Sequence, residues 1–497
     1  MSTLQTAASE PATESGLVEF GHIIDGKEVQ STSGEVFTSI DPYTREPWAV
    51  FPLGSNAEAD LAIAAARRAF DEGPWPRMTA SERRTLLHRF ADLIELHGEE
   101  LAMADTRDMG KPITQSLSND VSRTALNFRF FADHAHGSAA EVLPMDTPHH
   151  AYTRFDPAGV VVAIAPWNFP MMLESWKVAP ALAWGNTVVL KPAEDSPASA
   201  TIMARLALEA GIPPGVFNVV HGYGADSVGE ALTANADVDR ITFTGESSTG
   251  KVIARAAASN LIPVSLELGG KGANVVFADA DLDNAIAWSI KAIYTNAGQV
   301  CLAGSRIYVE RPIYQEFLRR FVDAAESMRL GDPKDPATQI GPLASGVHYE
   351  KVRGYVETIP ESGGEQITGG LDEGWFVRPT VIREPDAGSP HQREEIFGPV
   401  VTITPFDNEP EAVALVNDSP YGLNAMVFTE DLSKAHRVSA ALVVGTVWVN
   451  CFFVRDLRAP FGGAKQSGVG REGGNFSREF FTEPKAVIMQ IERSHTH

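Results

Sequence analysis

Cysteine is rare in this chain, and one of its two cysteines lies where a reactive thiol would be useful. Cys301 ends the segment 296–301, and Glu267 lies upstream in a glycine-rich turn, between two leucines. A thiol beside a carboxylate base suggests covalent catalysis on a carbonyl group. Apolar neighbours favour a raised pKa for Glu267, which suits a general base. The alternatives are a small buried cysteine, as Cys451 is expected to be, and a carboxylate satisfied at a turn.

An asparagine is expected to serve the same reaction. Asn168 follows an apolar run that is typical of a buried parallel strand. Ligands of open α/β sheets gather at the carboxyl ends of strands. The Asn168 amide can donate a hydrogen bond to a developing oxyanion there, and such a donor is typically worth about 3 kcal/mol of barrier. A turn-forming asparagine is the alternative.

The segment 191–194, Lys-Pro-Ala-Glu, follows the next strand pattern and ends at the same edge of the sheet. The Glu194 carboxylate can accept hydrogen bonds from both hydroxyls of an adenosine ribose. It would repel a 2′-phosphate by up to about 4 kcal/mol at 4 Å and an effective dielectric of 20. This favours NAD over NADP, although Lys191 tempers the repulsion. The alternative is a solvated surface pair.

Two further turns have features of a dinucleotide site. Residues 243–250 give a strand, a glycine turn and a helix start, and helix N-termini bind pyrophosphate. The spacing is not that of the Rossmann fingerprint, so this signal is weak by itself. In the segment 394–400, Glu395 could bind the nicotinamide ribose while Phe397 packs near the ring. A charged loop over a core aromatic is the alternative.

Strand and helix patterns alternate along the chain. Strands are expected at residues 159–165, 187–191, 216–220 and 240–244, with helices at 196–211, 224–234 and 247–259. A second series from about residue 263 includes strands at 274–277 and 400–405 and a helix at 313–328. The rhythm predicts a parallel sheet with helices on its faces. Earlier helices are expected at 56–70 and after the capping-box pattern of Thr79 and Glu82. The strand-like segment 480–491 is expected to pair with the sheet edge of another subunit.

Composition limits the class of protein. At 497 residues, with 44% apolar and 21% charged residues, the chain is long enough for roughly three domains. The net charge of −23 argues against nucleic acid or an anionic membrane as the main partner. Two cysteines make no disulfide framework, and residues 1–17 have the composition of a mobile tail without a signal peptide. No apolar run approaches the roughly 20 residues that span a bilayer, so a cytoplasmic protein is expected.

Taken in chain order, the motifs resemble those of the aldehyde dehydrogenase family. The matching residues are Asn168, Lys191, Glu194, Gly245, Glu267, Cys301, Glu395 and Phe397, with Asn450 and the segment 460–463. The resemblance covers about residues 18–491 and implies an α/β fold with two parallel-sheet domains and a small β arm. The implied parts are an NAD-binding domain at 18–136 and 157–265, a catalytic domain at 266–465, and an oligomerisation arm at 137–156 and 478–495. A homodimer or homotetramer is implied too.

The resemblance also implies a mechanism with NAD as cofactor and no metal. Cys301 attacks the aldehyde, and the Asn168 side chain and the Cys301 backbone N–H stabilise the oxyanion. After hydride transfer to NAD, Glu267 activates the water that hydrolyses the thioester. Relatives that pass the acyl group to coenzyme A commonly lack this glutamate, so a free acid product is favoured. Lys191 is expected to take part in catalysis as well. The implied cofactor-binding residues are Ala165, Pro166, Trp167, Lys191, Ala193, Glu194, Gly224, Phe243, Thr244, Gly245, Gly250, Leu268, Glu395 and Phe397.

One departure points to a branch of the family. Many members have serine where this chain has Glu246, and a carboxylate near pyrophosphate is repulsive unless it points away. Glu246 and the segment 453–458 are similar to the muconic semialdehyde branch, which acts on carboxylated semialdehydes. An arginine inside a substrate tunnel suggests an anionic substrate group. The expected substrate residues are Arg455, Arg123, Phe169, Trp176 and Phe461, with Arg458 in place of Arg455 and pairing with an acid such as Asp456 as the alternatives.

Other functions stay open at this point. Within the family, the substrate could be a general aliphatic, aromatic or amino aldehyde. A non-catalytic binding protein on the same fold is a different class, although the presence of Cys301 and Glu267 speaks against it. A hydrolase that uses only the thiol is a third class.

Overall fold

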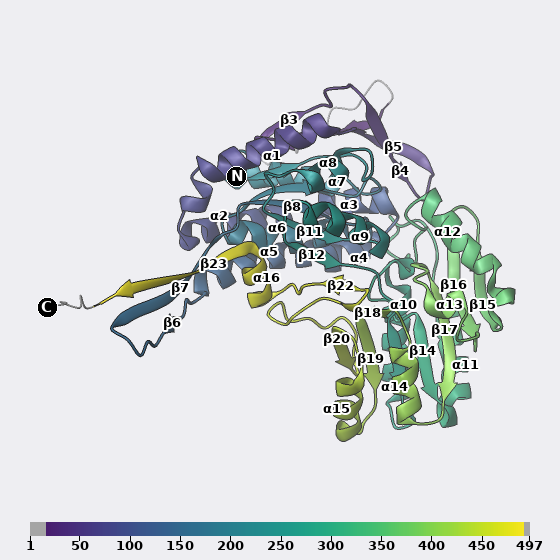
Figure 1. Ribbon diagram of the computed structural model, residues 1–497. Coiled ribbons are helices and arrows are strands. Elements are labelled where there is room, and N and C mark those ends of the chain that lie inside the picture. The colour runs from purple at the N-terminus through teal and green to yellow at the C-terminus, as the bar shows by residue number, and fades with distance from the viewer. Residues whose placement is uncertain (1–15, 492–497) are drawn as a thin grey trace, which may run out of the picture.

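The computed structural model describes residues 16–491. The tail expected at 1–17 and the end of the arm expected at 478–495 therefore lie largely or partly outside the described residues. Figure 1 shows two sheet-containing units, one formed mainly by the first half of the chain and one mainly by the second, and a long β arm that projects from the first unit.

The first sheet has eight strands in the order β22-β12-β11-β8-β9-β10-β2-β3. Its strands are β2 (His22–Ile24), β3 (Lys27–Val29), β8 (Val160–Ile164), β9 (Thr187–Lys191), β10 (Phe217–Val219), β11 (Arg240–Thr244), β12 (Val264–Glu267) and β22 (Gly468–Val469). The strands from β12 to β10 in this order run parallel. This confirms the parallel sheet expected from the sequence.

Helices cover both faces of this sheet, which explains its apolar strands. Val161 and Ala163 of β8 belong to one buried cluster, and Val160, Val162 and Ile164 belong to another. Alternate residues of a strand point to opposite faces, so a strand covered on both sides must be apolar throughout. The helices of this unit are α1 (Asn56–Asp71), α6 (Pro170–Ala183), α7 (Ala198–Glu209), α8 (Val228–Ala234) and α9 (Ser247–Ala258).

Two helix limits differ from the expectation. Helix α8 begins at Val228 rather than at 224, because Ser227 has the extended conformation of a residue that precedes a helix. Helix α7 ends at Glu209 and begins at Ala198, with Pro197 rather than Ser196 directly before it. Gly224 therefore lies in an exposed loop and not at a helix start.

The second sheet has seven strands in the order β15-β16-β17-β14-β13-β19-β20. These are β13 (Ala273–Val276), β14 (Arg306–Glu310), β15 (Glu365–Leu371), β16 (Val377–Arg383), β17 (Val400–Phe406), β19 (Asn424–Phe428) and β20 (Thr446–Val449). All neighbouring pairs are parallel except β15 with β16. Its helices are α10 (Leu282–Tyr294), α11 (Tyr314–Glu326), α12 (Gly346–Glu357), α13 (Pro390–Arg393), α14 (Glu409–Asn417) and α15 (Leu432–Ala441).

The remaining elements frame these units. They are β1 (Val18–Glu19), β4 (Val36–Asp41), β5 (Glu46–Pro52), η1 (Trp75–Arg77), α2 (Ala80–Leu96), α3 (Gly98–Met109), α4 (Ile113–Gln115), η2 (Ser116–Val121), α5 (Ser122–Gly137), η3 (Thr295–Gly298), η4 (Arg311–Ile313), η5 (Ile359–Ser362), β18 (Tyr421–Gly422), β21 (Ala464–Lys465) and α16 (Gly474–Phe481). Thr79 and Glu82 form the expected capping box at the start of α2. Among the described residues, no helix is long and apolar enough to cross a membrane.

The arm consists of β6 (Val142–Leu143), β7 (His149–Pro157) and β23 (Thr482–Gln490). Strand β23 pairs along its whole length with β7 of its own chain, so its main partner is intramolecular. In the sheet order β23-β7-β6 it is an edge strand. Pairing of this edge with another subunit, as expected from the sequence, stays a prediction.

Candidate active site

A cavity of about 430 Å³ lies where parts of both sheet units meet. It brings together residues from segments far apart in the sequence, at the carboxyl ends of several strands. Of the residues expected to act in catalysis or to bind the cofactor, its lining includes Pro166, Trp167, Asn168, Glu194, Thr244, Gly245, Leu268, Cys301, Glu395 and Phe397. Ligands of parallel sheets bind at such strand ends.

Other expected cofactor residues lie behind this lining. The residues concerned are Ala165, Lys191, Ala193, Gly224, Phe243 and Gly250, none of which lines the cavity. Phe243 packs under Gly245, where a side chain at Gly245 would meet its ring. Gly250 likewise leaves room for Leu268, which lines the cavity itself. Phe243 and Gly250 therefore shape the glycine turn, and their contact with the cofactor stays a prediction.

The loop that holds Cys301 has an unusual backbone. Asn296 and Ala297 have φ angles of 51° and 52°, a conformation that non-glycine residues rarely adopt. Side chains fix the loop in this form: the Asn296 amide donates to the carbonyl of Asn168 over 2.8 Å. Gln299 receives the Ala344 N–H at its amide oxygen over 2.9 Å. Both side chains are buried, and no local sequence pattern singles them out.

The Asn168 amide is directed at this loop. Its Nδ2 donates to the Gln299 carbonyl over 2.9 Å. An amide nitrogen carries two hydrogens, so one N–H holds the side chain in place and the other is free for a ligand. Close approach also matters at Gly270, where an added Cβ would collide with the Cys301 carbonyl. Glycine at 270 therefore lets the Glu267 turn pack against the Cys301 backbone.

The Cys301 thiol is protonated in this environment. Burial and, to a smaller extent, the nearby carboxylates of Glu395 and Glu267 together raise its pKa to about 12, against the Arg455 charge. The thiolate fraction is thus lower than an ordinary thiol pKa would give. A base or an added positive charge is needed before Cys301 can act as a nucleophile.

Glu267 ends strand β12 and is buried with neither carboxylate oxygen hydrogen-bonded among the described residues. Burial raises its pKa well above the usual range, and Glu472 adds to this, while Lys177 and two arginines oppose it. The Lys177 ammonium contacts Glu472 at 3.2 Å and Thr242 at 3.0 Å. A buried carboxyl with an elevated pKa and free oxygens suits proton transfer.

Lys191, the lysine expected at this site, lies next to Glu194 of the cavity lining. The Lys191 ammonium donates to the Pro192 carbonyl over 2.9 Å and to Glu194 over 3.4 Å. This geometry fits a part in cofactor binding. Among the described residues, no hydrogen bond or ion pair joins Lys191 to Cys301 or Glu267, so its catalytic role stays a prediction without a supporting contact. The neighbouring Asp195, which the sequence did not single out, also lines the cavity.

Glu395 and Phe397 belong to the lining of the same cavity. Glu395 receives the Gly270 N–H over 2.8 Å, and burial raises its pKa to about 7. The Phe397 ring packs edge-on against Trp167 at 5.3 Å, and His348 lies 4.9 Å from Trp167. The His348 ring nitrogen donates to the Phe397 carbonyl over 2.8 Å. These rings give the site an aromatic wall.

The chain is similar to known proteins along most of its length. The model of the aldehyde dehydrogenase family matches residues 29–487. The chain belongs to the aldehyde dehydrogenase family. It is 47% identical to a 2-hydroxymuconic semialdehyde dehydrogenase of Pseudomonas sp. (strain CF600), over 95% of this chain and all of the relative. It is 42% identical to a 2-aminomuconic 6-semialdehyde dehydrogenase of Pseudomonas sp., over 96% of this chain and 99% of the relative.

Solved structures of the family agree with this. The P. syringae indole-3-acetaldehyde dehydrogenase AldA, solved as a mutant with NAD+ and IAA, superposes with a TM-score of 0.93 at 41% identity. The match covers 95% of this chain and 96% of that one. The aldehyde dehydrogenase fold expected from the motifs is thereby confirmed.

Two arginines and two aromatic side chains form a cationic cluster near Cys301 in this aldehyde dehydrogenase. The Arg455 guanidinium lies 4.6 Å from the Trp176 ring and 4.0 Å from the Phe461 ring. Burial and the nearby Arg123 lower the pKa of Arg455 to about 10. The influence of Arg455 on the thiol pKa shows that this charge lies near Cys301.

Neither Arg455 nor Arg123 forms an ion pair among the described residues, although Glu472 and Glu267 lie near enough to raise the pKa of Arg455 against the effect of burial. Arg458, the alternative to Arg455, is 75% exposed and pairs with Asp456 at 2.5 Å. The structure therefore turns Arg455 inward and Arg458 to solvent. Within the described residues, no ion pair to Arg455 or Arg123 is present, and Arg123 has a buried Nη1 without a hydrogen-bond partner. Phe169, the remaining expected wall residue, is buried with the Lys111 ammonium 3.6 Å from its ring centre.

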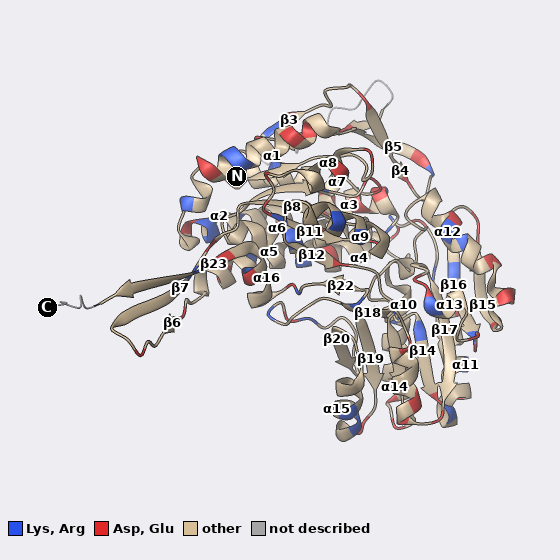
Figure 2. Ribbon diagram, in the orientation of Figure 1, with Lys and Arg blue, Asp and Glu red and all other residues tan. Residues whose placement is uncertain are grey.

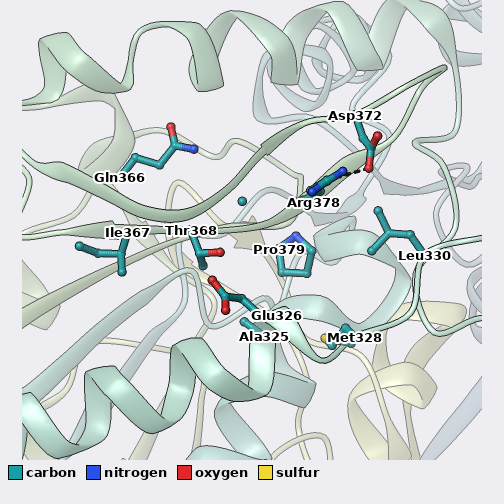
Figure 3. A pocket seen from close by; sticks show the side chains of 11 residues that line it. Ala325, Glu326, Met328, Leu330, Gln366, Ile367, Thr368, Asp372, Arg378 and Pro379 are labelled. Carbon is teal, nitrogen blue, oxygen red and sulfur yellow. Dashed lines mark hydrogen bonds and ion pairs between the residues drawn. The ribbon is translucent and has the colours of Figure 1, made fainter.

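A larger cavity of about 660 Å³ lies elsewhere, between the end of α11 and the β15–β16 pair (Figure 3). Figure 3 shows Arg378 hydrogen-bonded to Asp372 at its rim, and Glu326 and Thr368 further along the wall. None of the residues expected to do chemistry lines it. Size alone therefore does not identify the active site of this protein.

Proposed function

We propose that this protein oxidises an aldehyde to a carboxylic acid with NAD as the hydride acceptor. The observation that carries the proposal is a single cavity that brings Cys301 and Asn168 together with Glu194, Glu395 and the glycine turn at Gly245. A cysteine nucleophile, an oxyanion donor and groups suited to two riboses and a pyrophosphate lie in one place. The matched relatives and the NAD+ complex of a neighbour support this assignment.

The cofactor cradle fits a dinucleotide. Helix α9 starts beside Gly245, and no side chain caps its first turn, so its backbone N–H groups are available to an anion. Glu194 and Glu395, which both line the cavity, can each accept hydrogen bonds from ribose hydroxyls. The Glu194 carboxylate disfavours a 2′-phosphate, which supports NAD over NADP. When bound, NAD supplies the hydride acceptor and a positive ring next to Cys301.

The residues of the site then act in order. Glu267 takes the proton of the Cys301 thiol, and the sulfur forms a bond to the aldehyde carbon. The free N–H of Asn168 and the Cys301 backbone N–H hold the resulting oxyanion. NAD held by Glu194, Glu395 and the glycine turn would accept the aldehyde hydride, and collapse of the oxyanion would leave a thioester on Cys301. Glu267 passes the thiol proton to solvent, then removes a proton from the water that attacks the thioester, and returns that proton to the sulfur as the acid leaves.

A panel of aldehydes with NAD, followed by NADH absorbance at 340 nm, tests this function. Wild-type protein is expected to turn over, and Cys301→Ala is expected to form no NADH while still binding the cofactor. NADH formation by Cys301→Ala, or ester hydrolysis without NAD as the main activity, would contradict the mechanism.

We infer that the substrate carries a carboxylate, as a muconic-type semialdehyde does. The support is two arginines near the nucleophile, with aromatic neighbours and with no ion pair among the described residues, although Glu472 and Glu267 lie nearby. A carboxylate of the substrate would supply a direct ion pair, held by a bidentate guanidinium. Two of the matched relatives are dehydrogenases of such semialdehydes. A general aliphatic, aromatic or amino aldehyde is the competing substrate class.

We also propose a homo-oligomer that forms through the arm. The outer edge of β23 has no strand partner among the described residues, and Ile488, Met489, Val142 and Leu143 on the arm are exposed. A small exposed sheet of this kind has little stability alone, and an open edge invites another strand. Sedimentation should show a dimer or tetramer, and removal of residues 482–491 should yield a smaller species. The expected cytoplasmic location stays a prediction.

A further inference from the structure

An ion pair spans the rim of the cofactor cavity. Glu246 directly precedes helix α9 of the first unit, and Lys351 lies on helix α12 of the second. The Lys351 ammonium and the Glu246 carboxylate are 2.8 Å apart, and both residues line the cavity. Their side chains are 42% and 65% exposed, so the contact lies at the mouth. In Figure 1, α12 lies beside the α9 end of the first unit, where the two units meet.

The charges of the cavity give this pair a particular importance. The lining contains four carboxylates, from Glu194, Asp195, Glu246 and Glu395, and Lys351 is its single lysine or arginine. A dinucleotide adds the negative charges of its pyrophosphate next to Glu246. Lys351 lowers the pKa of Glu246 and so keeps it ionised, and Ser248 donates a further hydrogen bond over 3.4 Å. One oxygen of the carboxylate thus faces Lys351, and the other faces Ser248 in the first turn of α9.

We propose that Glu246 and Lys351 form a clasp across the mouth of the cofactor cleft, which opens each time the dinucleotide enters or leaves. This inference rests on the proposed function, namely that the cleft binds NAD. The clasp explains how a carboxylate is tolerated at the pyrophosphate turn, because Lys351 neutralises it. It also ties α9 to α12 over the bound cofactor. Glu246 acts here through Lys351 and is a positioning residue.

The release rate of NADH from the full-length protein tests the clasp. Bound NADH is displaced by excess NAD in a stopped-flow fluorimeter, at low salt and at 0.5 M salt. Exposed ion pairs are worth little, so Glu246→Gln and Lys351→Met are each expected to release NADH about two- to fivefold faster at low salt. The difference should shrink at high salt, where the pair is screened. The double variant should be no faster than either single variant.

A matched control and a charge exchange separate the clasp from simple charge effects. Arg353→Met removes a cation from the same helix, but Arg353 pairs with Glu350 and Glu357 of α12 itself, so release should not change. Exchange of the two charges, Glu246→Lys with Lys351→Glu, should restore slow release.

Three results would overturn the inference. Unchanged release in the single variants would do so, and so would additive effects in the double variant. In the third result, the Glu246→Lys variant alone would release NADH as slowly as the charge-exchange variant does. This would mean that the charge next to the pyrophosphate acts without the Glu246–Lys351 ion pair. Wild-type protein that binds no NADH at all would refute the proposed function together with the clasp, whereas normal NADH binding with unchanged release would refute the clasp alone.

Discussion

Replacement of Arg455 by methionine gives the sharpest test of the substrate assignment. Methionine keeps an unbranched side chain between Trp176 and Phe461 but removes the charge. Hydrogen bonds to a charged group are worth about 1.5–3 kcal/mol when lost, and about 1.4 kcal/mol corresponds to a factor of ten. For a carboxylated semialdehyde, kcat/KM is therefore expected to fall by roughly ten- to 150-fold. Most of the loss should appear in KM, because the carboxylate is remote from the reacting carbon.

The assay compares two aldehydes of equal length, one with a terminal carboxylate and one without, by NADH absorbance. For the neutral aldehyde, kcat/KM should fall by less than about threefold, since this substrate makes no ion pair with Arg455. Arg458→Met is the matched control, because Arg458 is exposed and bound to Asp456. Equal losses for both aldehydes in Arg455→Met would refute the carboxylate-binding role.

The same variant has an opposite expected effect on stability. The pKa of Arg455 is lowered to about 10 by burial and by Arg123, so the folded state disfavours the charged form. A cation whose pKa is lower in the folded state costs stability at every pH below that pKa. Removal of the charge should raise the melting temperature at pH 7–8, and the gain should fade as the pH rises through about 10. A fall in melting temperature at neutral pH would show that Arg455 has a counter-ion.

Further predictions concern the base, the cofactor and the nucleophile loop. Glu267→Gln should give one burst of NADH per active site and then stall at the thioester, and steady turnover near the wild-type rate would identify another base. In the wild type, the raised pKa of Glu267 means that the rate should fall with decreasing pH well above the usual glutamate pKa of about 4.3, and a plateau down to pH 5 would contradict this. Glu194→Gln should raise the NADP-to-NAD ratio of kcat/KM, by roughly tenfold because the side chain is partly exposed, and an unchanged ratio would remove its role in selection. Gly270→Ala should reduce kcat by more than tenfold with the fold retained by circular dichroism, since its Cβ would displace the Cys301 carbonyl, and normal kcat would show that the loop can yield.

Local sequence signals were sufficient to single out the residues that we propose as catalytic. Cys301, Glu267 and Asn168 stand in short glycine- or proline-rich segments next to apolar strands, and parallel strands place their carboxyl ends at one edge. The sheet itself follows from the alternation of buried strands and helices. The predicted helix starts were less accurate than the predicted strands. Helix α8 begins at Val228 rather than at 224, because several residues before Val228 could serve as the N-cap.

Other features depend on contacts that no local pattern specifies. Lys351 and His348 reach the cavity from helix α12, whose sequence is that of an ordinary surface helix. Whether Arg455 or Arg458 faces inward depends on the loop after Asn450, where Phe453 has a φ of 59°. Asn296 and Gln299 also depend on such contacts, because their side chains hold the Cys301 loop in its unusual backbone conformation. Such residues are identified only when their partners are known.

The raised pKa of the Cys301 thiol has a consequence for the resting protein. The thiolate fraction at neutral pH is far below that of an ordinary thiol. Peroxide and alkylating reagents attack thiolates, so the protein without bound NAD should resist inactivation by these reagents and oxidation during storage in air. Reactivity should rise only after the pyridinium ring has arrived, which would make addition of the two ligands ordered and leave the sulfur inert until it is needed.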